Sequence, residues 1–286
     1  MNWSVGCRSL ELFDEPMGVA FPVLVLYPSP ALQQPEQFGP YTLDVARDGA
    51  LAEGVFALVV ISHGTGSSHL VMRDLGAHLA RNGFVVAMLE HPRNNRNNND
   101  LAYTAANLEN RPRHVRLVVD WAVAEFGTLP GIALVGHSLG GYTALAVAGG
   151  HPAAFAHECP DQQARPLVVT PDARVQALVL LAPATCWFLA PGALNDVRLP
   201  ILMLTAEQDP HTPGWHGEIV KRGVRDACRV EHRVVPNAGH FSFLSPFPAA
   251  MTNPAFPPSQ DPPGFDRESF HREMNAEVLE FLRRVL

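Results

Sequence analysis

The sequence predicts an α/β fold, a mostly parallel central sheet with helices covering both of its faces. Apolar runs of strand length alternate with amphipathic stretches of helix length along most of the chain. The run 55–62 is apolar on both faces, which is typical of a strand buried in a parallel sheet. The 286 residues are 47% hydrophobic and 17% charged, so the chain can form a core and is not disordered.

The expected elements follow from the period of each run and from the residues that end it. The first three strands, 9–13, 21–27 and 41–46, have no helices between them and should form an antiparallel edge. The remaining expected strands are 55–62, 84–89, 132–135, 175–181, 201–205 and 229–235, and the expected helices are 70–81, 113–126, 142–148 and 268–286.

The alternation is interrupted in two places, and both are too short to be separate domains. Residues 151–174 lack a regular pattern, and residues 245–264 contain seven prolines. We therefore expect one domain, 1–286, in which these two insertions form loops or a small cap over a site.

Composition limits the partners. The net charge is −7 and Lys221 is the only lysine, so nothing favours nucleic acid or an anionic membrane surface. No apolar run reaches the roughly 18 residues of a membrane span, and no signal peptide is recognised, so a cytoplasmic location is the default expectation. The four cysteines lack C-x-x-C spacing, which favours free thiols; a Cys159–Cys186 disulfide is the alternative.

A candidate nucleophile lies between the strand 132–135 and the helix that follows it. Gly136-His137-Ser138-Leu139-Gly140 fits the pattern G-x-S-x-G. A sharp strand-to-helix turn would expose the Ser138 hydroxyl, with glycines where a Cβ would collide and a helix N-terminus to stabilise negative charge. The alternative is a serine that only caps the helix. We expect His137 to be packed or hydrogen-bonded rather than to act as a base.

An acid and a base should follow the nucleophile, each in a loop at the carboxyl end of a strand. Asp209 fits the acid, with Glu207 as its near rival, and His240 in the loop after the last strand fits the base. A metal site built from Asp209, His211 and His216 lacks a helical H-x-x-x-H pair and a fourth ligand. The weaker candidates for the base are His211, His216 and His232.

Two backbone N–H groups are needed to stabilise an oxyanion. The N–H of Leu139 directly follows the nucleophile, and that of Thr65 lies in the glycine-rich loop after strand 55–62, with Gly64 as the runner-up. This loop matches neither G-x-G-x-x-G nor a Walker motif, so we expect no dinucleotide and no other cofactor. Candidate substrate contacts around this loop and after the histidine are Gly64, Glu90, His91 and Phe241.

Five motifs together resemble one group of enzymes. They are S-H-G-T-G (62–66), L-E-H-P (89–92), G-H-S-L-G-G (136–141), 207–209 and N-A-G-H-F-S-F (237–243). This set resembles bacterial α/β-hydrolases of the dienelactone-hydrolase-like type, related to platelet-activating-factor acetylhydrolases. The resemblance implies the α/β-hydrolase fold, a triad containing Ser138 and His240, and an oxyanion hole formed by the N–H groups of Leu139 and Thr65.

The chain departs from these relatives in two ways. Dienelactone hydrolases use a cysteine nucleophile, whereas this chain has Ser138. In the acetylhydrolases the acid follows the strand after the nucleophile helix, but residues 181–184 contain no carboxylate, so Asp209 takes that role from the next strand.

The predicted function is hydrolysis of small to medium carboxylic esters, lactones or thioesters through an acyl-enzyme on a serine. The alternatives are an amide hydrolase, or an acyltransferase or cyclase of a biosynthetic pathway, on the same triad. A third hypothesis is a non-catalytic binding protein. The expected partner is a small ester-type molecule, and the sequence does not determine the oligomeric state.

Overall fold

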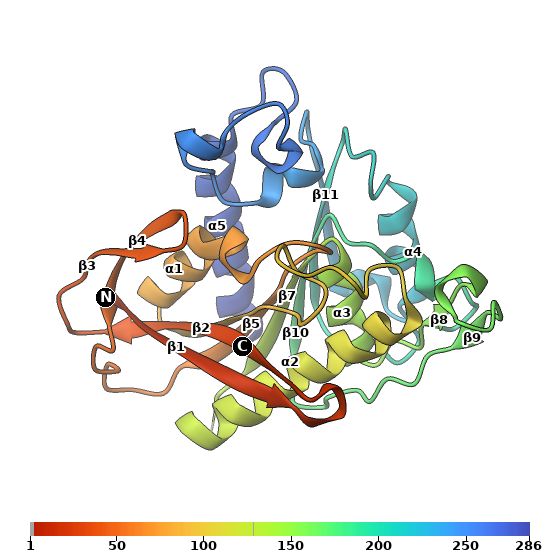
Figure 1. Cartoon of the computed structure of the whole chain (residues 1–286), viewed down its shortest axis with the longest axis horizontal. Coiled ribbons are helices and arrows are strands. Elements are labelled where there is room, and N and C mark those ends of the chain that lie inside the picture. Colours follow the sequence, from red (N-terminus) through yellow and green to blue (C-terminus); the bar gives the residue numbers. More distant parts are fainter. Residues whose placement is uncertain (1–2, 128) are drawn as a thin grey trace.

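A computed structural model describes residues 3–127 and 129–286, and within these ranges it contains one large sheet of ten strands (Figure 1). The spatial order is β12-β11-β10-β7-β5-β6-β2-β1-β4-β3. The strands are β1 (Ser4–Asp14), β2 (Val19–Ser29), β3 (Gln34–Phe38), β4 (Tyr41–Arg47), β5 (Ala57–Ser62), β6 (Phe84–Leu89), β7 (Ile132–His137), β10 (Ala177–Leu181), β11 (Ile201–Ala206) and β12 (Val230–Val235).

The five α-helices of the described ranges flank this sheet (Figure 1). They are α1 (Arg73–Arg81), α2 (Ala105–Phe126), α3 (Leu139–Val147), α4 (Trp215–Gly223) and α5 (Arg267–Val285). The sequence did not lead us to expect α4. A separate two-stranded sheet, β8 (Ala153–Ala154) with β9 (Arg165–Pro166), lies in the insertion 151–174.

Six neighbouring strands, from β6 to β12, run parallel, as the apolar runs predicted. The expected antiparallel edge is only partly correct. Strands β1 and β2 pair antiparallel, and so do β2 and β6. However, β4 joins β1 in parallel, with Gly6 opposite Ala46, and the unexpected β3 pairs antiparallel with β4.

Alternate side chains of the buried strands enter two separate cores. In β5, Leu58 and Val60 pack in the core that contains α2 and α3. Val59 and Ile61 pack in the opposite core, which contains α1 and α5. Because successive strand residues point to opposite faces, a strand covered on both sides must be apolar throughout. This confirms the predicted layered arrangement.

Helix α2 begins eight residues before the expected start, and a proline inside it explains the error. Pro112 has no N–H to donate to the carbonyl of Leu108, so proline usually ends or begins a helix. Here Tyr142 Oη donates to that carbonyl at 3.0 Å and replaces the missing bond. Thr104 caps the true start, where its Oγ1 accepts from the N–H of Asn107 at 3.2 Å.

The proline-rich insertion 245–264 is ordered and lies over one end of the sheet, as the blue segment above the strands in Figure 1. It contains two short 3₁₀ helices, Ala249–Met251 and Pro257–Ser259. The carboxylate of Asp261 accepts from Ser242 Oγ at 2.7 Å and from Arg267 Nε at 2.8 Å. These bonds tie the insertion to the loop before it and to α5.

Three cysteines, Cys7, Cys159 and Cys186, are free thiols, and Cys159 and Cys186 do not form the alternative disulfide. The side chain of Cys228 lies outside the described part of the chain. In the ranges that the structure covers, no helix is both long and apolar enough to span a membrane.

Candidate active site

The turn between β7 and α3 has the strained geometry that the G-x-S-x-G pattern predicted. Ser138 has φ 54° and ψ −119°, a conformation that residues with a side chain rarely adopt. A Cβ on Gly136 would lie 2.2 Å from the carbonyl oxygen of Gly140, and a Cβ on Gly140 would lie 1.9 Å from that of Ser62. Both positions therefore require glycine.

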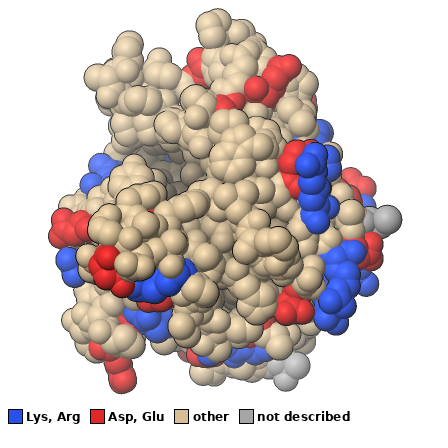
Figure 2. Space-filling model, turned by 90° about the vertical axis from the view of Figure 1, so that its right-hand side faces the viewer, with Lys and Arg blue, Asp and Glu red and all other residues tan. Residues whose placement is uncertain are grey.

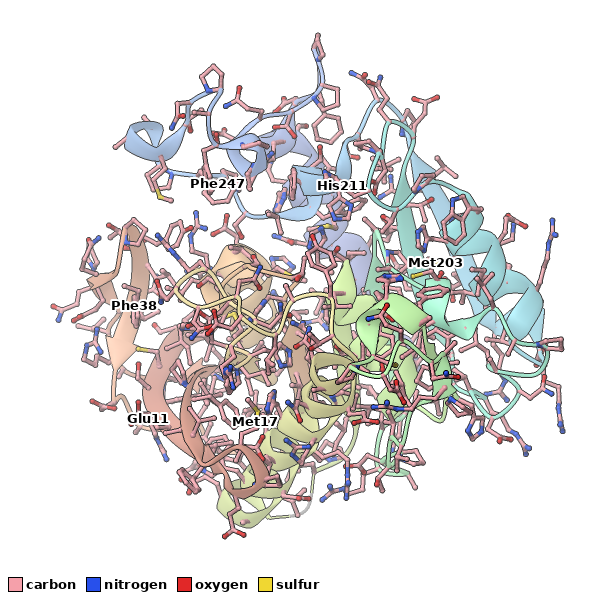
Figure 3. All side chains as sticks on the ribbon, turned by 45° about the vertical axis from the view of Figure 1, so that its right-hand side comes forward. Glu11, Met17, Phe38, Met203, His211 and Phe247 are labelled. Carbon is pink, nitrogen blue, oxygen red and sulfur yellow. The ribbon has the colours of Figure 1, made fainter. Side chains whose placement is uncertain are left out.

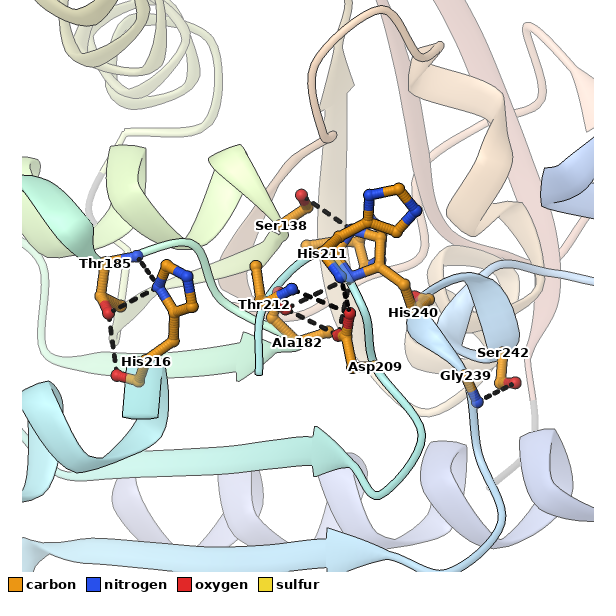
Figure 4. A network of polar contacts seen from close by, with 11 residues as sticks. Ser138, Ala182, Thr185, Asp209, His211, Thr212, His216, Gly239, His240 and Ser242 are labelled. Atoms are coloured by element: carbon orange, nitrogen blue, oxygen red, sulfur yellow. Dashed lines mark hydrogen bonds and ion pairs between the residues drawn. The ribbon is translucent and has the colours of Figure 1, made fainter. Parts of the chain in front are cut away.

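Ser138, His240 and Asp209 form a continuous chain of hydrogen bonds (Figure 4). The distance from His240 Nε2 to Ser138 Oγ is 3.0 Å, and that from His240 Nδ1 to Asp209 Oδ2 is 2.8 Å. All three side chains are buried, with Ser138 at the wall of a cavity. The geometry is that of a nucleophile, a base and an acid that orients the base.

Asp209 is held by two backbone groups and one hydroxyl. Its Oδ1 accepts from the N–H groups of His211 and Thr212, both at 2.8 Å, and its Oδ2 accepts from Thr212 Oγ1 at 2.6 Å. Burial acts to raise the pKa of Asp209, but the hydrogen bonds from His240 and Thr212 outweigh it and keep that pKa below its ordinary value. Sequence reasoning missed Thr212, because the turn pattern at Asp209 predicts only that its carboxylate accepts from a backbone N–H two residues further on.

Glu207, the rival acid, is exposed and lies outside this chain of hydrogen bonds. Its carboxylate accepts from the N–H of Asn237 at 2.7 Å and so supports the turn that leads to His240. The local sequence could not separate the two carboxylates, because both follow β11 within a few residues. The fold separates them, since only Asp209 turns inward.

The other candidate bases do not bond Ser138. His216 Nδ1 accepts from the N–H of Thr185 at 2.9 Å, and His232 lies 2.9 Å from Thr205 Oγ1. The ring of His211 lies 4.9 Å from that of His240, at the cavity wall. Among the residues that the structure covers, no three His, Cys, Asp or Glu side chains are grouped as metal ligands would be.

His137 is buried and supports the backbone of the candidate base. Its Nε2 donates to the carbonyl oxygen of His240 at 2.9 Å. Burial, and next the nearby His240, lower the pKa of His137 to about 3, so it is neutral at physiological pH. It is therefore a packed, hydrogen-bonded residue, as the sequence led us to expect.

A cavity of about 860 Å³ opens at Ser138. Gly64, Thr65, Leu139 and Phe241 line it. No described residue accepts a hydrogen bond from the N–H of Leu139 or of Thr65. The structure thus brings Ser138 together with two free backbone donors at one cavity.

Two expected substrate contacts need correction, because Glu90 and His91 lie outside the cavity lining. Both follow β6 at the expected end of the sheet, but their side chains are buried within the protein. A Glu90 oxygen lies 3.1 Å from His69 Nδ1, and His91 Nε2 lies 2.9 Å from Ser62 Oγ. They support the loops around the cavity instead of facing it.

The cavity walls are largely apolar and come partly from the proline-rich insertion. Figure 2 shows a hollow beneath the top of the molecule with mostly uncharged walls. Figure 3 shows Phe247 of the insertion and His211 at the same end of the sheet. Arg96 and Glu158 are the only Arg, Lys, Asp or Glu among the described lining residues. The insertion contributes Phe247, Met251, Asn253, Phe256 and Pro258 to the lining.

Comparisons with known proteins agree with this fold. Residues 54–190 match the family described as serine aminopeptidase, S33. The structure resembles that of a ferulic acid esterase from Streptomyces cinnamoneus with a TM-score of 0.73 and 21% sequence identity, over 99% of this chain and 90% of that chain. No curated protein sequence matches the chain.

The sheet order, the turn between β7 and α3 and the structural similarity show that the chain has the α/β-hydrolase fold. The family match, which is to a family of serine hydrolases, covers residues 54–190, and the structural similarity at 21% identity concerns the fold alone. Neither similarity is to a dienelactone-hydrolase-like protein, so that subfamily rests only on the resemblance of the sequence motifs.

Proposed function

We propose that the protein is a serine-dependent carboxylic ester hydrolase with Ser138 as nucleophile, His240 as general base and Asp209 as the orienting acid. The observation that carries the proposal is the unbroken hydrogen-bond chain Asp209–His240–Ser138 at the wall of a cavity. An isolated capping serine would need neither the buried acid nor the strained turn.

The reaction would proceed in two halves. His240 Nε2 takes the proton of Ser138 Oγ as this oxygen attacks the carbonyl carbon, while Asp209 stabilises the imidazolium. The N–H groups of Leu139 and Thr65 donate to the oxyanion. The imidazolium then protonates the leaving alcohol, which leaves an acyl group on Ser138. Water, deprotonated by His240, attacks the acyl carbon, and the imidazolium returns this proton to Ser138 Oγ as the acid leaves.

The walls support an apolar substrate of limited size. A cavity of about 860 Å³ is within the range of small-molecule sites. Its lining is dominated by uncharged side chains, which favours small to medium esters, lactones or thioesters. A second candidate, amide hydrolysis, is favoured by the match of residues 54–190 to a serine aminopeptidase family.

The test is turnover of p-nitrophenyl esters of two to eight acyl carbons, together with labelling by a fluorophosphonate. We expect wild-type protein to hydrolyse the shorter esters and to carry one label on Ser138. Ser138→Ala should abolish both, and His240→Ala should lower kcat by about four or more orders of magnitude without unfolding the protein. Near-normal kcat in His240→Ala would overturn the assignment of the base.

Two parallel assays distinguish ester hydrolysis from amide hydrolysis and from acyl transfer. One uses matched anilides as substrates, and the other adds an alcohol or amine nucleophile. Hydrolysis of esters in preference to anilides supports the esterase. Faster cleavage of anilides, or transfer of the acyl group to the added nucleophile in competition with 55 M water, would favour the alternatives of amide hydrolysis or acyl transfer.

A further inference from the structure

A fully buried guanidinium lies directly behind the nucleophile turn. Arg111 of α2 is 0% exposed, and no carboxylate of the described residues forms an ion pair with it. All its hydrogen-bond acceptors are neutral oxygens. Burial lowers the pKa of Arg111 to about 9, so the side chain still carries its charge at neutral pH.

One side of this guanidinium holds the glycine-rich loop 62–66. Its Nη2 donates to the carbonyl oxygen of His63, and its Nη1 donates to Asn94 Oδ1 at 2.6 Å. Asn94 Nδ2 in turn donates to Thr65 Oγ1 at 2.9 Å. Arg111 therefore restrains the loop directly at His63 and through Asn94 at Thr65.

The other side holds the first turn of the nucleophile helix. Arg111 Nε donates to Thr143 Oγ1 at 3.1 Å, and Thr143 Oγ1 donates to the carbonyl oxygen of Leu139 at 3.0 Å. One planar group thus spans the two segments that carry the free N–H groups of Thr65 and Leu139. A planar guanidinium with five N–H donors suits this task, whereas an ammonium does not.

Stability alone does not explain the arrangement. A buried charge without a counter-ion costs several kcal/mol, and an ion pair would offset part of that cost. Arg113, two residues further on, has such a pair, with bonds of 2.9 and 2.7 Å to Asp14. Burial, and next the charge of Arg111, keep the pKa values of the neighbouring His63 and His91 well below their usual range, so both rings are uncharged and add no second positive charge.

We propose that Arg111 is a positioning residue for the oxyanion hole. It fixes loop 62–66 and the start of α3 at the separation at which the N–H groups of Thr65 and Leu139 meet the same oxyanion. Its uncompensated positive charge also favours the negative charge that develops there. This inference rests on the proposed function, because an oxyanion forms only if Ser138 attacks a carbonyl.

The experiment compares Arg111→Met with Arg113→Met, a matched change two residues away on the same helix. We measure kcat and KM for a short p-nitrophenyl ester, the inhibition constant of an alkyl trifluoromethyl ketone and the melting temperature. Arg111→Met should lower kcat about 100-fold with KM changed less than threefold, and should weaken the ketone, a tetrahedral mimic, by a similar factor.

Arg113→Met should lower the melting temperature but change kcat less than threefold. Arg111→Met with wild-type kcat and ketone affinity would overturn the inference, whatever its melting temperature. If Arg111→Met does not fold, Asn94→Ala replaces it, since this change cuts the link to Thr65, together with the bond of Asn94 to Asn99, and leaves the bonds of Arg111 to His63 and Thr143. It should lower kcat and ketone affinity together by about tenfold, and unchanged values would again overturn the inference.

The two proposals fail in different ways. Wild-type protein that neither hydrolyses esters nor reacts with a fluorophosphonate at Ser138 would overturn the proposed function itself. Active wild-type protein whose kinetics do not depend on Arg111 would overturn only the positioning role.

Discussion

Replacement of Asp209 by asparagine tests the geometry of the candidate triad most directly. In the wild type, Asp209 Oδ1 accepts two backbone N–H groups, from His211 and Thr212, while Oδ2 faces His240 Nδ1. An asparagine has only one acceptor oxygen, and the two fixed N–H groups would claim it. The amide NH₂ must then point at His240 Nδ1.

The consequence follows from the tautomers of the imidazole. An NH₂ donor facing Nδ1 favours the form in which Nδ1 accepts and Nε2 carries the proton. A protonated Nε2 cannot take the proton of Ser138 Oγ, 3.0 Å away, so the base is lost although every atom stays in place. A wrong tautomer of this kind costs about 10⁴ in kcat, or about 5 kcal/mol in the barrier.

The assay is steady-state hydrolysis of p-nitrophenyl acetate at pH 7.5, with circular dichroism to check folding. The matched control is Glu207→Gln, on the same loop. Glu207 is exposed and accepts only the N–H of Asn237, which a glutamine oxygen can also accept, so kcat should stay within about twofold of wild type. The reasoning is refuted if Asp209→Asn keeps more than a tenth of kcat, or if Glu207→Gln is the more damaging change.

Three further predictions follow. Gly140→Ala should prevent folding or lower the free energy of unfolding by more than about 3 kcal/mol, because its Cβ would lie 1.9 Å from the carbonyl oxygen of Ser62. Gly214→Ala, with open space around it, should change the free energy of unfolding by less than about 1 kcal/mol. Urea titrations measure both values, and equal losses would contradict the reasoning. Shortening the insertion between Phe247 and Phe265 should broaden acyl-chain preference while fluorophosphonate labelling persists, and an unchanged preference in a folded variant would reduce the segment to a tether. Burial acts to raise the pKa of Asp14, but hydrogen bonds from His114 and Arg113 outweigh it and lower that pKa to about 2. The ionised carboxylate therefore contributes about 2 kcal/mol to the free energy of unfolding above pH 4, and this contribution is lost as the pH falls towards 2. The difference in unfolding free energy between wild type and Asp14→Asn should narrow over that range, and a constant difference would contradict the reasoning.

The fold could be predicted largely from local patterns. A strand covered on both faces must be apolar throughout, which is why strands such as β6 were located within a residue or two. The order of serine, acid and histidine, each after a strand, also follows from the chain alone, because the carboxyl ends of parallel strands meet at one edge of the sheet. The glycines around Ser138 indicate a turn in which backbone segments lie too close together for a Cβ, and this can be predicted from the local sequence.

Only the tertiary structure decided which polar groups face the cavity and which support it. Helix α2 continues through Pro112 because a tyrosine from another helix satisfies the carbonyl that proline leaves free, and no local signal announces such a partner. Glu90 and His91 stand at the expected edge but turn inward, and Arg111 lies beneath the nucleophile turn although nothing in its neighbourhood of the sequence marks it. Propensity and periodicity are set by residues a few positions apart, whereas the partner of a buried polar group comes from any part of the chain that the fold brings near it.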